Sequence, residues 1–397
     1  MKTSLHYGHT RTAAYIAYIT QAIVNNLGPL LFLTFRRQFN LSLGSLALLV
    51  SLNFAVQLGV DLGAVRFMDR IGYRAAAVGA HLSCTLGLLA MGFLPFVMNP
   101  YGGLLIAVTL NAIGGGIAEV IISPLVEALP GTRKAAAMSL LHSFYCWGYV
   151  LVVLLSTLYF TLIGIDYWRF LPMLWALLPL GNAFLFAGVP IAVLTSPSKP
   201  ALPAAALFKK RIFLVLLVVM VCSGASEQAM SQWASLFAEA GLGVSKTLGD
   251  LLGPCGFAVL MGLARIFFGL KGGHINPEKA LLFSGLLCTA SYLIAVFSPH
   301  PLLALGGCAL CGLSVGLMWP GSLSIASRRF PLGGTPMFAL LALAGDLGCG
   351  AGPGIVGLVM GGSALKPGIL AATVFPLTLS VLFALLYTRS RSRQGAQ

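Results

Sequence analysis

Long apolar stretches separated by short polar segments run along almost the whole chain. Each stretch is close to the roughly 20 residues that an α-helix needs to cross a bilayer. Twelve such spans can be marked, at residues 12–35, 44–66, 74–98, 101–128, 136–163, 170–194, 212–240, 247–270, 279–298, 302–327, 335–361 and 366–388. This pattern predicts an all-α membrane protein with twelve transmembrane helices.

The longest segment between spans falls near the middle of the chain. Residues 195–211 are rich in Pro, Ala and Lys, and they predict a cytoplasmic linker between two six-helix bundles, residues 1–194 and 212–397, the second with a short basic tail. Two short sequence repeats indicate that the two halves are related. FAVQLG in the second span recurs as FAVLMG in the eighth, and a Gly and a Pro eight positions apart recur in the fourth and tenth. Two parallel repeats are typical of transporters that bind their substrate near the midplane.

Composition supports a membrane location. Hydrophobic residues make up 58% of the chain, charged residues 9%, and the mean hydropathy is +0.93. The net charge of +14 could suggest nucleic acid, but the basic residues lie in short clusters between apolar runs, as topology signals do, so we expect no nucleic-acid partner.

The basic residues also predict an orientation. With both ends in the cytoplasm, only five of the 24 Lys and Arg residues lie outside, namely Arg36, Arg37, Arg169, Lys246 and Lys366. The positive-inside rule therefore predicts an N-in, C-in topology. The compact loops favour a multi-pass protein of a bacterial inner membrane, and we expect a monomer.

Several motifs that could indicate an enzyme or a metal site lie inside apolar helices. Cys308 and Cys311 form a CxxC without a second Cys pair or His cluster, so we expect neither a metal nor a cofactor. GLSVG at residues 312–316 fits a nucleophile elbow but lacks the strand-to-helix turn, and GCGAGPG at 348–354 lacks the Gly-Lys-Ser/Thr of a phosphate loop. We interpret both as small-residue faces that allow close helix packing, and we expect no enzymatic activity.

The segment RFMDRIGYR at residues 66–74, between the second and third spans, resembles the cytoplasmic motif of the major facilitator superfamily. The family pattern is Gly-x-Leu-x-Asp-Arg-x-Gly-Arg-Arg, and the chain departs from it at two positions. The matching residues are Asp69, Arg70, Gly72 and Arg74. A plain turn with topology charges would explain the arginines but not the ordered Asp-Arg-x-Gly. The resemblance implies the two-bundle fold and a cytoplasmic gate at these residues.

A narrower resemblance, to fucose/proton symporter-like sugar porters, rests on three helices. Asn25-Asn26-Leu27 matches that family's helix 1, Glu119 to Pro124 is similar to its helix 4, and His142-Ser143-Phe144 stands where it has Asn-Ser-Phe. The acidic residue that the family places after Asn-Asn-Leu is absent here, and Gly-Pro follows instead. The resemblance implies a sugar-like solute and proton coupling.

The same resemblance implies that helices 1, 4, 7 and 10 face a central cavity. Amides and indole rings on these helices provide the hydrogen bonds and apolar platforms that suit a small polar solute. The predicted substrate-binding residues are Gln21, Asn25, Asn26, Asn111, Gln228, Gln232, Trp233 and Trp319. The alternative is that the amides hold neighbouring helices together and the Trp side chains anchor the protein at the membrane interface.

Charged residues inside the spans point to ion coupling. A charge at a helix centre costs roughly 2.5 to 3.5 kcal/mol, so such residues are functional candidates by default. Glu119 lies deep in an apolar stretch and is the leading proton site; the other coupling candidates are Glu227, Asp61 and His142. For His142, a packing role is the alternative. We predict that Arg265 and Asp346 form a buried structural pair.

Together these features predict a secondary transporter that works by alternating access. The leading hypothesis is proton-coupled symport of a small polar solute, with a sugar as first candidate. Alternatives are a proton-coupled efflux antiporter of drugs or metabolites, a sodium-coupled symporter, and a sensor or intramembrane protease. The expected partners are the solute, protons or sodium, and the lipid bilayer.

Overall fold

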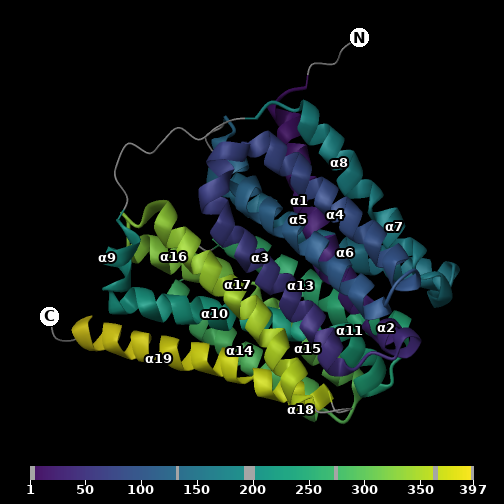
Figure 1. Ribbon diagram of the computed structural model, residues 1–397. Helices are drawn as coiled ribbons and strands as arrows, with labels where there is room; N and C mark the ends of the chain where they lie inside the picture. Colours follow the sequence, from purple (N-terminus) through teal and green to yellow (C-terminus); the bar gives the residue numbers. More distant parts are fainter. Residues whose placement is uncertain (1–4, 131–133, 192–201, 272–275, 361–364, 395–397) are drawn as a thin grey trace. The chain divides into compact units, whose positions relative to one another are not determined.

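The computed structural model describes the backbone of residues 5–130, 134–191, 202–271, 276–360 and 365–394, and all regular elements within these ranges are helical (Figure 1). Eleven helices in these described ranges are long and apolar enough to cross a membrane. A twelfth span is made by α1 (Tyr7–Leu30) and α2 (Phe32–Phe39), which meet at an angle of 46°. The predicted all-α fold with twelve membrane spans is confirmed.

The break in the first span has a local cause. Pro29 lies inside α1 and has no backbone N–H to continue the helical ladder, and a proline ring also crowds the preceding turn. Leu31, between the two helices, has a ψ near 0° and donates its N–H to the Gly28 carbonyl. The Gly-Pro pair therefore bends the first span just after its polar residues.

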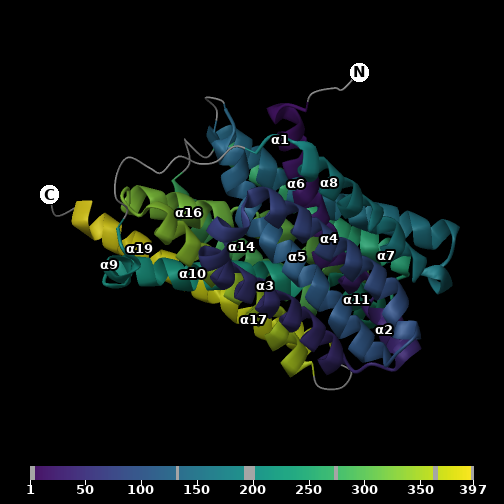
Figure 2. The same ribbon diagram turned by 45° about the horizontal axis from the view of Figure 1, so that its top comes forward.

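The chain divides into two compact units, Met1–Ser196 and Pro197–Gln397. The first contains α1, α2, α3 (Leu43–Ile71), α4 (Tyr73–Phe93), α5 (Pro100–Ala128), α6 (Lys134–Leu162), α7 (Phe170–Trp175) and α8 (Leu177–Gly188), with short turns at Leu94–Phe96 and Ile165–Tyr167. Both views of the ribbon show α1, α4, α5 and α6 running side by side (Figures 1 and 2).

The second unit begins with a short helix, α9 (Ala204–Phe208), inside the segment predicted as a linker. Its other helices are α10 (Arg211–Ser231), α11 (Ala234–Leu236), α12 (Lys246–Asp250), α13 (Gly256–Lys271), α14 (Pro277–Phe297), α15 (Pro301–Val315), α16 (Met318–Arg329), α17 (Gly334–Val359), α18 (Leu365–Ala372) and α19 (Val374–Gln394). Two π-helical turns, η3 (Phe237–Gly241) and η4 (Leu251–Cys255), interrupt the seventh and eighth spans.

The two units repeat the same internal packing. In the first unit α1 packs on α6, α4 on α5, α3 on α5, and α4 on α8. In the second, the corresponding spans pair in the same order, α10 with α17, α14 with α15, α13 with α15, and α14 with α19. This repetition within each unit confirms the pseudo-symmetry that the sequence echoes predicted.

The small-residue runs lie where helices approach most closely. A Cβ atom added at Gly348 of α17 would strike the backbone carbonyl of Val221 in α10, and one at Gly312 of α15 would strike the Phe257 carbonyl in α13. Only glycine permits these approaches without a shift of the helices. The apparent nucleophile elbow and phosphate loop are therefore helix-packing faces.

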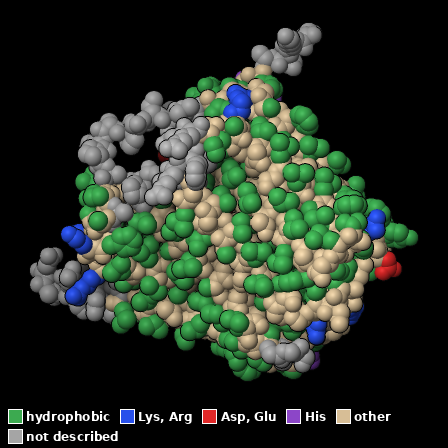
Figure 3. All heavy atoms as spheres, in the orientation of Figure 1, with side chains coloured by type: hydrophobic (Ala, Val, Ile, Leu, Met, Phe, Trp, Pro, Cys, Tyr) green, Lys and Arg blue, Asp and Glu red, His purple; other side chains and the backbone are tan. Residues whose placement is uncertain are grey.

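The surface fits a bilayer. Apolar side chains are spread over the whole face drawn in Figure 3, and the few Lys and Arg side chains lie near its margins. Large hydrophobic side chains such as Phe184, Leu270 and Leu358 are exposed. In water such a surface would drive aggregation, whereas in lipid it is the natural outer face of a helical membrane protein.

Candidate functional site

In the first unit, a carboxylate and an amide meet between α1 and α5. The Gln21 side-chain Nε2 donates a hydrogen bond of 2.6 Å to Oε2 of Glu119, and Gln21 is buried while Glu119 is half-buried. A hydrogen bond to a charged oxygen is shorter and stronger than a neutral one. The structure thus brings together a predicted coupling residue and a predicted solute-binding residue.

A second polar contact lies one helical turn away on both helices. The Tyr18 hydroxyl, on α1, is 2.8 Å from Oγ of Ser123, on α5. The ring of Tyr18 also meets the ring of His142, on α6, edge to face with centroids 5.2 Å apart. Tyr18 thus places His142 about one helical turn from the Gln21–Glu119 contact. Tyr18 was not predicted from the sequence, because a lone tyrosine in an apolar helix gives no charge signal.

An amide cluster follows one turn further along α1. Oδ1 of Asn25 accepts hydrogen bonds from Gln57, at 2.9 Å, and from Asn53, at 3.3 Å, both on α3. All three side chains are buried. Gln57 belongs to the FAVQLG segment that supported the internal repeat. Neither Gln57 nor Asn53 was predicted as a site residue, because only helices 1, 4, 7 and 10 were expected to face the cavity.

The other predicted residues of this unit occupy separate places. Asn26 donates to the Ala22 carbonyl at 2.8 Å and to the Tyr145 hydroxyl at 3.4 Å. Asn111 is 1% exposed, and its amide meets Gly87 of α4 without a hydrogen-bond partner in the described part of the chain. Asp61 is half-buried on α3, four residues after Gln57 and so on the same face.

In the second unit, Glu227 of α10 and Arg265 of α13 form an ion pair with an N–O distance of 3.2 Å. Their side chains are 10% and 17% exposed. From the sequence, these two residues were predicted to have different roles, Glu227 in ion coupling and Arg265 as the partner of Asp346. Asp346 lies on α17 and is 9% exposed, and its pairing with Arg265 stays a prediction.

The predicted aromatic and amide residues of the second unit lie on α10, at its end, or against α17. Gln232 donates to Gln228 at 3.1 Å, one turn apart. Trp233 is fully buried, and its indole N–H donates to the Pro353 carbonyl at 3.2 Å. Trp319 of α16 packs so closely on Gly345 of α17 that a Cβ atom there would overlap the indole ring. Both tryptophans thus contact α17 inside the bundle.

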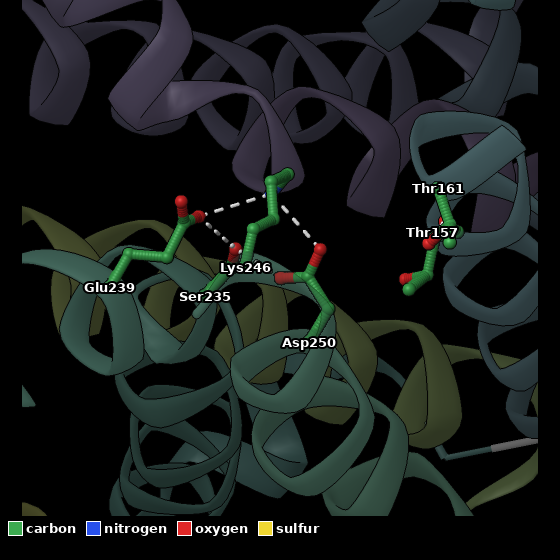
Figure 4. Close-up of polar contacts among 6 residues, drawn as sticks. All are labelled: Thr157, Thr161, Ser235, Glu239, Lys246 and Asp250. Atoms are coloured by element: carbon green, nitrogen blue, oxygen red, sulfur yellow. Dashed lines mark hydrogen bonds and ion pairs between the residues drawn. The ribbon is translucent and has the colours of Figure 1, made fainter. Parts of the chain in front are cut away.

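A third charged cluster was not predicted. Lys246 lies between Glu239 and Asp250, and Ser235 bonds to Asp250 (Figure 4). From the sequence, Lys246 was predicted only as one of the basic residues outside the membrane, since it stands between two spans. The available signal was the i,i+4 spacing of Lys246 and Asp250, which places both on one face of a short helix.

The motif between the second and third spans is described only in part. Gly72 has a φ of +78°, a conformation that favours glycine, and it separates α3 from α4. Nη1 of Arg74 donates to the Phe186 and Ala187 carbonyls at the end of α8, at 3.0 and 2.6 Å, where a positive charge complements the helix dipole. The side chains of Asp69 and Arg70 lie outside the described residues, so their gate role stays a prediction.

No group of three or more His, Cys, Asp or Glu side chains in the described ranges is arranged to hold a metal ion. The eight cysteines are buried thiols, none of them in a disulfide. The chemistry that the polar clusters offer is hydrogen bonding and proton exchange.

A comparison with known protein families identifies the family of the chain. The profile of the Major Facilitator Superfamily matches residues 13–353. The chain belongs to this superfamily of membrane transporters for small solutes. No curated protein sequence matches it.

Solved structures with the same fold cover nearly the whole chain. A point mutant of the Escherichia coli fucose:proton symporter FucP is 16% identical, with a TM-score of 0.66 over 94% of this chain and 98% of its own. A bacterial homologue of the human lysosomal transporter Spinster is 14% identical, with a TM-score of 0.75 over 96% of both. A point mutant of the nucleoside transporter NupG is 11% identical, with a TM-score of 0.74 over 96% of this chain and 99% of its own. At these identities the likeness establishes the fold.

Proposed function

We propose that the chain is a proton-coupled symporter of a small polar solute, with Glu119 as the proton-carrying group. A sugar is the first solute class to test. The fucose:proton symporter among the similar structures supports this choice, and the nucleoside transporter widens the panel to nucleosides. The protein would be a monomeric, non-enzymatic carrier in a bacterial inner membrane, with both ends in the cytoplasm.

The hydrogen bond between Gln21 and Glu119 is the observation that carries the proposal. A carboxamide contains both a donor and an acceptor, so Gln21 can donate to the carboxylate or, after its amide turns, accept from the protonated acid. An amide partner therefore accompanies either protonation state of Glu119. This versatility suits a carboxyl group that gains and loses a proton in every cycle.

The same helix joins the proton site to the amide cluster. Gln21 and Asn25 are one turn apart on α1, and Asn25 bonds to Gln57 and Asn53 on α3. A polyhydroxylated solute that takes hydrogen bonds from this cluster would compete with its internal contacts and alter the position of α1. We infer that solute binding and protonation are coupled through this turn of α1.

The energetic yield of such coupling is substantial. Moving one charge through 100 mV provides about 2.3 kcal/mol. Since about 1.4 kcal/mol corresponds to a tenfold ratio, one proton per solute supports an accumulation of roughly fifty-fold from the voltage alone. A Glu119 variant that cannot be protonated would lose this accumulation but could still exchange solute.

The test is uptake into proteoliposomes of labelled sugars, amino sugars and nucleosides under an inward proton gradient. We expect Glu119→Gln to abolish accumulation while solute exchange without a gradient continues, which separates lost coupling from lost folding. Glu127→Gln is the matched control, because Glu127 is an exposed glutamate on the same helix α5. Full accumulation by Glu119→Gln would refute the assignment, and uptake driven only by a sodium gradient would replace the proton with sodium.

A further inference from the structure

The end of the predicted linker nearest the second bundle is attached to that bundle. The backbone N–H of Leu202 donates to the Leu332 carbonyl, in the turn between α16 and α17, at 2.8 Å. Leu207 of α9 is fully buried, and α9 packs on α10 and α17 (Figure 1). Residues 202–210, the docked segment, are therefore part of the second unit and hold a defined place on it.

Three phenylalanine rings connect the end of α9 to α10 and α16. The rings of Phe208 and Phe213 meet edge to face with centroids 6.0 Å apart, and the rings of Phe213 and Phe330 meet in the same way at 5.8 Å. Phe213 and Phe330 are buried, but Phe208, at the end of the row, is 45% exposed. Leu332 is 55% exposed. The docked segment and the turn that holds it therefore present two large apolar side chains on the surface of the second unit.

Three basic residues follow α9 directly. Lys209, Lys210 and Arg211 connect it to α10, and all three are exposed. Within the described ranges none of them forms an ion pair, and Glu278, at the start of α14, pairs with Arg329 instead. They also stand at the N-terminus of α10, where the helix dipole disfavours cations and the first turn has no acid. Nothing in the described part of the second unit therefore compensates these three charges.

These bases lie at the end of the membrane-spanning part of the bundle. The seventh apolar span starts at Arg211, and the tenth stops at Arg329. The contact between the rings of Phe213 and Phe330 brings these two ends together. Beyond the end of a span the hydrocarbon gives way to the headgroup region, where phosphates replace acyl chains as neighbours. Bases and apolar side chains exposed at this level therefore face lipid phosphates and acyl chains, respectively.

Topology alone is the simpler explanation of a basic cluster at the end of a span. It accounts for the charges, but not for the docking of the segment that precedes them, nor for Phe208 exposed beside Lys209. Apolar side chains next to bases, held at the bilayer surface, are typical of segments that bind anionic lipids. A lipid phosphate would supply the counter-charge that the described part of the second unit lacks.

We propose that Phe208, Lys209, Lys210, Arg211 and Leu332 form a binding site for the headgroup of an anionic phospholipid. The phosphate accepts hydrogen bonds from the three bases, and Phe208 and Leu332 contact the first part of an acyl chain. A zwitterionic headgroup carries its own ammonium, which the bases repel, so the site selects anionic lipids. None of these residues was assigned to solute binding or coupling, so the inference stands apart from the proposed transport activity.

Lipid binding can be measured on the detergent-purified full-length protein with an acyl-labelled fluorescent cardiolipin and microscale thermophoresis. The wild-type protein should bind cardiolipin, and unlabelled phosphatidylglycerol should compete far better than phosphatidylethanolamine. One base near an anionic lipid surface strengthens binding by roughly five- to sixfold. Lys209→Gln/Lys210→Gln, which removes two, should therefore weaken cardiolipin binding by roughly thirtyfold.

Arg36→Gln/Arg37→Gln is the matched control. It also removes two adjacent bases, but these lie in the last turn of α2, where the helix dipole compensates cations, so the affinity for cardiolipin should not change. Phe208→Ser retains every charge and stays informative if Lys209→Gln/Lys210→Gln does not insert into the membrane. It should also weaken cardiolipin binding, because the apolar contact with the acyl chain is lost.

Three results would overturn the proposal. The first is an affinity for cardiolipin that is unchanged in Lys209→Gln/Lys210→Gln or in Phe208→Ser. The second is competition by phosphatidylethanolamine that is as strong as competition by phosphatidylglycerol. The third is displacement of cardiolipin by inorganic phosphate at an ionic strength matched with sodium chloride, because the site would then bind free phosphate and not a lipid.

Discussion

Removing one member of the ion pair between Glu227 and Arg265 should destabilise the second bundle strongly. Arg265→Met keeps much of the side-chain volume but leaves the Glu227 carboxylate, 10% exposed, without the guanidinium 3.2 Å away. Breaking a buried pair from one side typically costs about 3 to 5 kcal/mol. For a unit of this size, 1 kcal/mol corresponds to roughly 2 to 4 °C, so we expect the unfolding midpoint to fall by roughly 10 °C.

The double variant Arg265→Met/Glu227→Gln distinguishes the contribution of the ion pair to stability from the contribution of each residue alone. Replacing a buried ion pair by neutral groups of similar shape is often nearly neutral, so the double variant should regain about 2 to 3 kcal/mol relative to Arg265→Met. The exposed Arg328 of α16 provides a matched control, because Arg328→Met should change stability by about 0.5 kcal/mol or less.

The cysteines provide the assay. All eight are buried thiols outside any disulfide, so a thiol-reactive fluorescent dye reports unfolding of the detergent-purified protein as the temperature rises. Equal midpoints for Arg265→Met and Arg328→Met would refute the reasoning. A double variant whose loss of stability equals the sum of the losses in Arg265→Met alone and Glu227→Gln alone would also refute it, since the two charges would then not interact.

Two further predictions concern helix packing and coupling. Gly348→Ala should lower the unfolding midpoint because its Cβ would strike the Val221 carbonyl, whereas Gly306→Ala, whose Cβ meets nothing within 4 Å, should not; equal midpoints would contradict the close α10–α17 contact. Gln21→Lys should place a cation beside Glu119 and abolish gradient-driven accumulation while exchange continues. Gln21→Met, which removes the hydrogen bond but adds no charge, should reduce accumulation less than Gln21→Lys does; accumulation by the Lys variant would show that the charge of Glu119 is not involved.

The membrane spans could be predicted from the sequence because the bilayer imposes two simple requirements. A span needs about 20 apolar residues, and its backbone must satisfy its own hydrogen bonds, which leaves the helix as the structure for such a run. The bend in the first span was not predicted, although Pro29 was noted, since a proline in a membrane helix can be accommodated with or without a large kink.

The partners of the charged residues could not be predicted in the same way. From the sequence, Arg265 was paired with Asp346 and not with Glu227. Choosing the right acid requires the rotation of each helix about its axis, which hydropathy does not provide. The spacing of Tyr18, Gln21 and Asn25, three and four residues apart, does predict that they share a face of α1. It does not reveal that Glu119 lies opposite Gln21.

Irregular helical turns are a further reason why Asp250 was not predicted as a site residue. A π-turn adds a residue to the helix and shifts the phase of everything that follows, so helical periodicity across η3 and η4 cannot tell which side chains face each other. Asp250 also lies near the start of its span, where a charge is usually interpreted as a membrane boundary. The structure instead places its carboxylate at 0% exposure beside Lys246.

The contrast between two of the carboxylate sites suggests how the chain assigns different tasks to the same chemical group. Glu227 has an arginine beside it, so its charge is balanced within the bundle and a proton would disturb that balance. Glu239 and Asp250 both lie against Lys246, so one ammonium group contacts two carboxylates. The neighbours of each acid, rather than its depth in a span, therefore decide how its charge is compensated.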